Sequence, residues 1–209
     1  FPNNIPEFFG LYGVDNLPII DISSTELYQN ELVPFKSACD SNVKSVMIGH
    51  IVIPSIDSSN IPATFSEKIT QNILRNTWNY KGLIITDALE MGALTSKTWH
   101  GESAIRSIEG GADIVLLPLD SKEAIESIQN AVIKGRISIE RINQSYNRII
   151  AAKEKLGLFD KKNNQTWSNV ESNIKISKNT KIASLIAEKS ITLVKNEDSF
   201  LPVVLNKYK

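Results

Sequence analysis

Apolar and polar positions along this chain fall into blocks that predict alternating strands and helices. Three apolar runs lack the alternation of a half-exposed strand, which is typical of strands buried on both faces in a parallel sheet. These runs cover residues 43–48, 82–87 and 112–118. Helical spacing and end signals predict helices over 23–40, 64–78, 102–109, 120–135 and 138–157. The alternation of strand and helix predicts right-handed βαβ units and a parallel α/β sheet.

Two of these helices begin with a Ser/Thr-x-x-Glu pattern, in which the first hydroxyl and the later carboxylate satisfy free backbone N–H groups. The two stretches are Ser23-Ser-Thr-Glu26 and Thr64-Phe-Ser-Glu67. Both are therefore expected to be capping boxes on exposed helix ends.

The carboxyl-terminal part of the chain has a different character. Residues 161–177 are rich in Asn, Ser and Lys, which favours a linker. A helix over 179–189 and a strand over 191–194 are expected to begin a further unit. The sequence thus predicts two parts, residues 1–160 and residues 161–209.

Composition excludes several classes of function. The formal net charge of the 209 residues is +0, without a basic stripe, which argues against a nucleic-acid partner. No apolar run is long enough to span a membrane. One cysteine, Cys39, and two histidines, His50 and His100, argue against a disulfide and a metal site. The chain begins with Phe1 rather than Met, and we expect its true amino terminus to lie outside it.

Candidate catalytic residues follow the ends of two predicted strands. Asp87 directly follows the second apolar run, and His50 follows the first after one glycine. In parallel α/β folds, the carboxyl ends of the strands carry the substrate-binding loops. An Asp after a strand is also a common helix N-cap, and a strand-end histidine is often satisfied by backbone groups. The pattern alone leaves both alternatives open.

The stretch around Asp87, Lys81-Gly-Leu-Ile-Ile-Thr-Asp-Ala-Leu-Glu-Met91, resembles the nucleophile motif of glycoside hydrolase family 3, in its bacterial β-N-acetylhexosaminidase branch. Other stretches resemble the family in the same order: 31–36, 46–50, 62–66, 111–118 and 135–138. The segment Ala187-Glu-Lys-Ser-Ile-Thr-Leu-Val-Lys-Asn196 is similar to the start of the family's second, α/β-sandwich domain.

This resemblance implies a retaining hydrolysis in which Asp87 attacks the anomeric carbon and forms a covalent glycosyl-enzyme. It implies that His50 and Met91 bind the sugar substrate, and that no cofactor is needed. The compartment stays open, with the bacterial cytoplasm favoured over secretion.

The chain departs from the family pattern at the proton donor. In the hexosaminidase branch this donor is a His held by an Asp, and Asn4 and Pro6 stand where the two are expected. Asn has no titratable proton. Glu7 is the nearby acid that could replace the donor if burial raised its pKa, and the alternative is a solvated loop glutamate.

The expected architecture is a partial (β/α)8 TIM barrel, covering about strands six to eight, followed by a linker and the start of an α/β sandwich domain. Its partners would be a carbohydrate and the missing amino-terminal half of the same barrel. The expected function is hydrolysis of β-N-acetylglucosaminides, such as peptidoglycan fragments. One alternative is a catalytically impaired sugar-binding relic. Another is an unrelated parallel α/β enzyme, against which the lack of a Gly-rich phosphate-binding motif argues.

Overall fold

The computed structural model describes residues 17–91, 94, 100–159, 174, 177–196 and 201. The chain divides into two compact units, Phe1–Phe159 and Asp160–Lys209. The helices and strands described in the first unit are α1 (Ser24–Gln29), α2 (Leu32–Asp40), β1 (Ser45–Ile48), η1 (Ala63–Phe65), η2 (Lys68–Thr77), β2 (Leu83–Thr86), α4 (His100–Gly110), α5 (Ser121–Ile133) and α6 (Ile139–Lys155). The second unit contains α8 (Ser177–Ser190).

The two strands are parallel, and Val46 pairs with Ile84 in their register. The segment 112–118 continues the sheet on the other side of β2, but it makes only the single parallel bridge between Ile85 and Ile114. The segment predicted as a third strand thus runs parallel beside β2, but it forms a single bridge rather than a strand. The reason is that the Asp113 side chain takes the N–H of Ile84, and the Thr86 hydroxyl accepts from Leu116 N–H.

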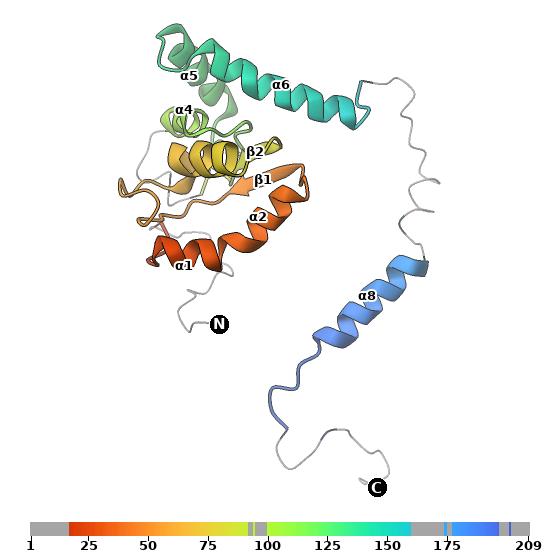
Figure 1. Cartoon of the computed structure of the whole chain (residues 1–209). Coiled ribbons are helices and arrows are strands. Elements are labelled where there is room, and N and C mark those ends of the chain that lie inside the picture. The colour runs from red at the N-terminus through yellow and green to blue at the C-terminus, as the bar shows by residue number, and fades with distance from the viewer. Residues whose placement is uncertain are drawn as a thin grey trace. The chain divides into compact units, whose positions relative to one another are not determined.

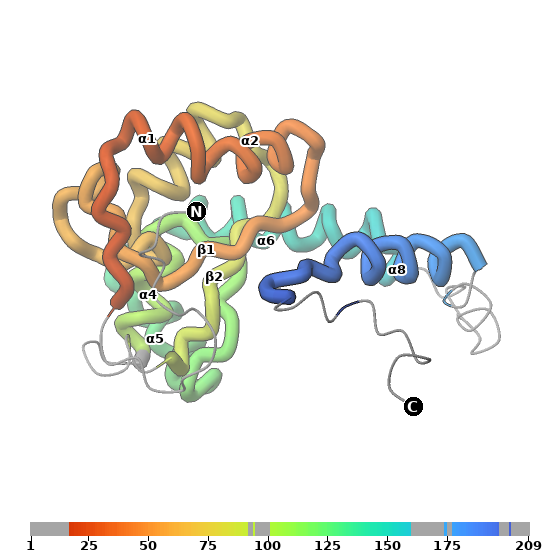
Figure 2. The backbone as a smooth tube through the Cα atoms, turned by 90° about the horizontal axis from the view of Figure 1, so that it is seen from below, coloured from red at the N-terminus to blue at the C-terminus, as the bar shows by residue number. Residues whose placement is uncertain are grey.

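Helices lie on two sides of the strand pair. Figure 1 and Figure 2 both place α1 and α2 on one side of the strands and α4 and α5 on the other. One core cluster lies around the fully buried Ile84 and includes Ile48 and Leu74. A second lies around Phe65 and Ala104, and connects η1 to α4 and α5.

The first predicted helix is split into α1 and α2. Ser23 caps α1 as expected, since its hydroxyl accepts from Glu26 N–H at 3.1 Å. Pro34 lies in the first turn of α2, where no backbone donor is required. In a continuous helix, Pro34 would lack its hydrogen bond and would clash with the carbonyl of Asn30, so the helix stops and restarts.

The second capping box does not form. Thr64 lies inside the 3-10 turn η1 and is buried, and the helix that follows, η2, is a π-helix. The Ser66 hydroxyl donates to Asp57 at 2.6 Å instead of capping a helix. Tertiary hydrogen bonds have therefore replaced the local capping pattern.

The helices from α4 onward agree with the sequence pattern. Asp120 caps α5 through the N–H groups of Lys122 and Glu123, and Ser138 caps α6. In the second unit, α8 has no buried residue, and residues 191–194 form no strand. The prediction of a strand there was wrong for the described chain, because a strand needs a neighbour to pair with and these side chains are exposed.

Candidate active site

Asp87 lies directly after the last residue of β2. Its N–H donates to the carbonyl of Ile48 on β1 at 2.9 Å, which fixes the backbone on the amino side. Its Oδ1 accepts from the N–H of Ala88 at 2.8 Å. A helix N-cap accepts from donors two or three residues ahead, so Asp87 does not have the geometry of a cap. Among the residues described, none donates to Oδ2.

His50 lies close to this carboxylate, as expected from its place at the end of β1. Its Nε2 is 2.9 Å from the carbonyl oxygen of Ala88, and its Nδ1 is 2.6 Å from the hydroxyl of Thr64. The side chain is buried, with 5% of its surface exposed. Burial lowers the pKa of His50, while the bond to Ala88 and the charge of Asp87 act in the opposite direction.

A turn connects Met91 to Ala88. Its N–H donates to the carbonyl of Ala88 at 3.2 Å, and its side chain is 40% exposed. The structure thus brings together Asp87, His50 and Met91, all around the Ala88 peptide groups. Glu7, together with Asn4 and Pro6, lies outside the described residues.

The sequence pattern missed Leu117, which lies beside the Asp87 loop. The N–H of Glu90 donates to the Leu117 carbonyl at 3.1 Å, and Leu117 has a positive φ of 42°. A left-handed conformation is costly for a non-glycine residue and is common near functional sites. No local signal predicts this conformation, because the residue before a proline, here Pro118, ordinarily favours extended backbone.

The sequence also gave no role to Asp57, in the loop after β1. This buried carboxylate accepts from Ser66, from the hydroxyl and N–H of Ser59, and from Lys68. Although burial alone raises its pKa, these hydrogen bonds together hold the pKa of Asp57 well below its usual value. Asp57 thus stays ionised and fixes the loop that leads from His50 to Thr64.

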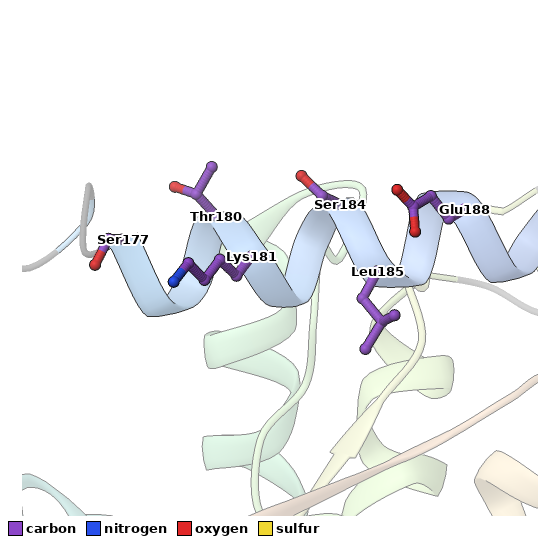
Figure 3. A pocket seen from close by; sticks show the side chains of 6 residues that line it. All are labelled: Ser177, Thr180, Lys181, Ser184, Leu185 and Glu188. Carbon is purple, nitrogen blue, oxygen red and sulfur yellow. The ribbon is translucent and has the colours of Figure 1, made fainter.

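Two hollows lie elsewhere. One, of about 550 Å³, lies along α8, and Figure 3 shows that its side chains all come from that single helix. The other, of about 250 Å³, is lined by Lys44, Lys81 and Lys155 near the amino ends of the strands. Neither is lined by Asp87 or His50. Within the described ranges, no cluster of three or more His, Cys, Asp or Glu side chains could hold a metal ion, and no helix has both the length and the apolar composition to cross a membrane.

This chain is similar in sequence to several glycosidases. A β-N-acetylglucosaminidase/β-glucosidase from Cellulomonas fimi is 28% identical over 84% of this chain, which spans 33% of that protein. A β-xylosidase from Formosa agariphila is 30% identical over 90% of this chain, which spans 27% of that protein. The chain therefore covers about a third or less of these relatives.

A solved structure of a glycoside hydrolase family 3 β-N-acetylglucosaminidase from Paenibacillus sp. FPU-7 superimposes with a TM-score of 0.77 and 31% identity. The superposition covers 90% of this chain and 36% of that one. The model of the glycosyl hydrolase family 3 N-terminal domain matches residues 12–152, which include Asp87, His50 and Met91. That domain has a TIM-barrel-type fold, consistent with the mixed α/β structure described above. This chain belongs to glycosyl hydrolase family 3.

Proposed function

We propose that this chain carries part of the active site of a retaining hydrolase for β-linked N-acetylglucosaminides, with Asp87 as the nucleophile. The observation that supports it is the state of the Asp87 carboxylate: Oδ1 is held by Ala88 N–H, and no described residue donates to Oδ2. A carboxylate fixed through one oxygen can attack the anomeric carbon with the other. The name of the Paenibacillus structure supports N-acetylglucosaminides as the substrate class.

The reaction has two steps with different needs. In the first, Asp87 displaces the leaving alcohol, which must be protonated as it departs; in the second, water needs a general base to release the sugar. Asn4 can do neither, because its amide does not titrate. In this proposal Glu7 is the acid that supplies and removes the proton, less efficiently than the missing His and Asp would, so the second step is slow.

The sheet supports a larger barrel around the site. Val46 and Ile84 pack into the core beneath the helices, whereas Met47, on the opposite face of β1, is 54% exposed. Among described residues, β1 pairs only with β2. In this proposal, β1, β2 and the segment 112–118 are strands six to eight of a (β/α)8 barrel, and the amino-terminal half of the barrel pairs with β1. A sharp cooperative thermal transition of these 209 residues as a monomer would contradict it.

The test of the nucleophile is Asp87→Asn in the full-length protein. Glu90→Gln is the matched control, because Glu90 is an exposed acid in the same loop. We expect Asp87→Asn to lose activity on a β-N-acetylglucosaminide by about 10⁴-fold or more, as for other nucleophile removals. The control should retain activity. Substantial turnover by Asp87→Asn would refute the assignment.

A sugar-binding relic is the second candidate, and the observation favouring it is the replacement of the expected His and Asp by Asn4 and Pro6. A dinitrophenyl β-N-acetylglucosaminide distinguishes the two, since its leaving group needs no proton. A hydrolase should give a rapid burst of phenolate, and azide should accelerate the slow second phase because azide needs no base. Binding of N-acetylglucosamine without any burst would favour the relic.

A further inference from the structure

A continuous chain of polar contacts connects η1 to the Asp87 carboxylate. The Thr64 hydroxyl is 2.6 Å from Nδ1 of His50, whose Nε2 is 2.9 Å from the Ala88 carbonyl oxygen. The N–H of the same Ala88 donates to Asp87 Oδ1 at 2.8 Å. Both backbone polar groups of Ala88 are thus occupied, the N–H by Asp87 and the carbonyl by His50 together with the N–H of Met91.

The chemistry of the acceptor determines the proton positions. A carbonyl oxygen only accepts, so the ring proton of His50 lies on Nε2 and is donated to Ala88. Since burial lowers the pKa of His50, the ring is neutral near pH 7 and Nδ1 carries a lone pair. The single proton of the Thr64 hydroxyl is then donated to Nδ1 at 2.6 Å rather than to the Gly49 carbonyl at 3.1 Å.

Thr64 is itself held rigidly. Its surface is 1% exposed, and α4 packs closely on the turn that contains it. At Gly110, an added Cβ would lie 2.9 Å from the Thr64 carbonyl oxygen and 2.8 Å from the Phe65 carbonyl carbon. The 3-10 turn therefore has little room to move away from His50.

We propose that Thr64 and His50 are a positioning pair, which fixes the backbone on both sides of the Ala88 Cα and thereby holds the Asp87 carboxylate in its attacking orientation. The inference rests on the proposed nucleophilic role of Asp87. The backbone of Asp87 is fixed on one side by Ile48 and on the other, through Ala88, by His50. Direct sugar binding by His50 would require breaking one of its two buried hydrogen bonds, which is costly.

The test replaces Thr64 in the full-length protein. Thr64→Val removes the donor to His50 with little change in shape, and Thr64→Ser restores the hydroxyl. Thr70→Val is the matched control, because Thr70 is also fully buried but donates to the carbonyl of Gly110. All four proteins are compared by the rate of the phenolate burst with the dinitrophenyl substrate.

We expect Thr64→Val to slow the burst by about 10²-fold with little change in KM, as misplacement of a reacting group does. Thr64→Ser should be close to wild type, and Thr70→Val should lower stability without slowing the burst. Equal burst rates in the two valine variants would overturn the proposal. A rise in KM alone in Thr64→Val would instead assign His50 to substrate binding.

A second measurement does not depend on activity. The imidazole ¹⁵N shifts of His50 should show a neutral ring protonated on Nε2. Amide hydrogen exchange at Ala88 should be faster in Thr64→Val than in Thr70→Val. Absence of a burst in the wild type would refute the proposed hydrolase, whereas unchanged exchange at Ala88 would refute the positioning pair.

Discussion

Two aspartates beside β2 occupy contrasting environments. Asp113 accepts hydrogen bonds from Ile84 N–H, Arg75, Ser145 and Arg148, at 2.6 to 3.0 Å, and its side chain has no exposed surface. Asp87, directly after β2, accepts only from Ala88 among the described donors. The Asp113 carboxylate therefore serves structure, with both oxygens bonded, whereas the Asp87 carboxylate has one oxygen without a donor among the described residues, as its proposed nucleophilic role requires.

The hydrogen bonds to Asp113 join elements that are distant in sequence. Arg75 comes from η2 and also donates to the carbonyls of Tyr80 and Gly82, while Ser145 and Arg148 come from α6. Asp113 thereby ties two helices to the start of β2. Removing the charge of Asp113 would leave buried guanidinium groups without compensation.

The largest effect on stability is expected for Asp113→Asn. We expect it to lower the free energy of unfolding by about 3 to 5 kcal/mol, the typical cost of breaking a buried ion pair. Asp120→Asn is the matched control, since Asn caps a helix about as well as Asp. Urea denaturation measures the stability of both variants. A loss of similar size in Asp113→Asn and Asp120→Asn would show that the buried hydrogen bonds of Asp113 give it no special structural role.

Removing one donor should have a smaller effect. The Ser145 hydroxyl donates to Asp113 at 2.7 Å, and Ser145→Ala should cost about 1.5 to 3 kcal/mol, as for a bond to a charged group. Ser127→Ala is the control, because Ser127 is similarly buried on α5 but is not bonded to Asp113. An equal loss of stability in Ser145→Ala and Ser127→Ala would mean that the Ser145 hydroxyl does not stabilise the Asp113 carboxylate.

The sequence predicted these two sites unequally. Asp87 and His50 were found because strand ends can be recognised from apolar runs, and the motif around Asp87 is local. Arg75 and Arg148, which donate to Asp113, lie 38 and 35 residues away from it along the chain, so no local pattern connects them. Thr64 was predicted as a helix cap because a local pattern does not reveal its actual partner, His50, which lies 14 residues away along the chain.

Mildly acidic pH should destabilise the region around His50 and Asp87. It should leave the cluster around Asp113 intact, because the arginines there stay charged. Burial holds the pKa of His50 below its ordinary value of 6.5. In the window between the folded pKa and 6.5, the unfolded chain binds the proton and the folded chain does not. Stability therefore rises with pH through this window and is lost as the pH falls below 6.5.

The measurement is the unfolding free energy of the wild type and of His50→Gln between about pH 7 and pH 5, the range in which histidine titrates. The wild type should lose more stability on acidification, because the glutamine variant lacks the titrating ring. Parallel curves for the two proteins would mean that His50 is not held as a neutral buried ring.

The smallest effect is expected at a third charged cluster, which tests whether burial or the number of hydrogen bonds determines the importance of Asp113. Arg136 donates four hydrogen bonds to Glu102 and Glu109, at 2.6 to 2.9 Å, as many as Asp113 accepts. Yet the side chains of Arg136 and Glu102 are 41% and 31% exposed. The bond to Arg136 lowers the pKa of Glu102, so this pair is formed near pH 7.

Glu102→Gln should nevertheless cost at most about 1 kcal/mol, because water and salt screen an exposed pair and Arg136 keeps Glu109. The loss should shrink further in about 1 M salt, where the screening length is about 3 Å. Asp113→Asn should keep its larger cost in the same salt, because its charges are shielded from solvent. A salt-resistant loss of 3 kcal/mol or so in Glu102→Gln would show that the number of bonds, rather than burial, sets the importance of a charged cluster in this protein.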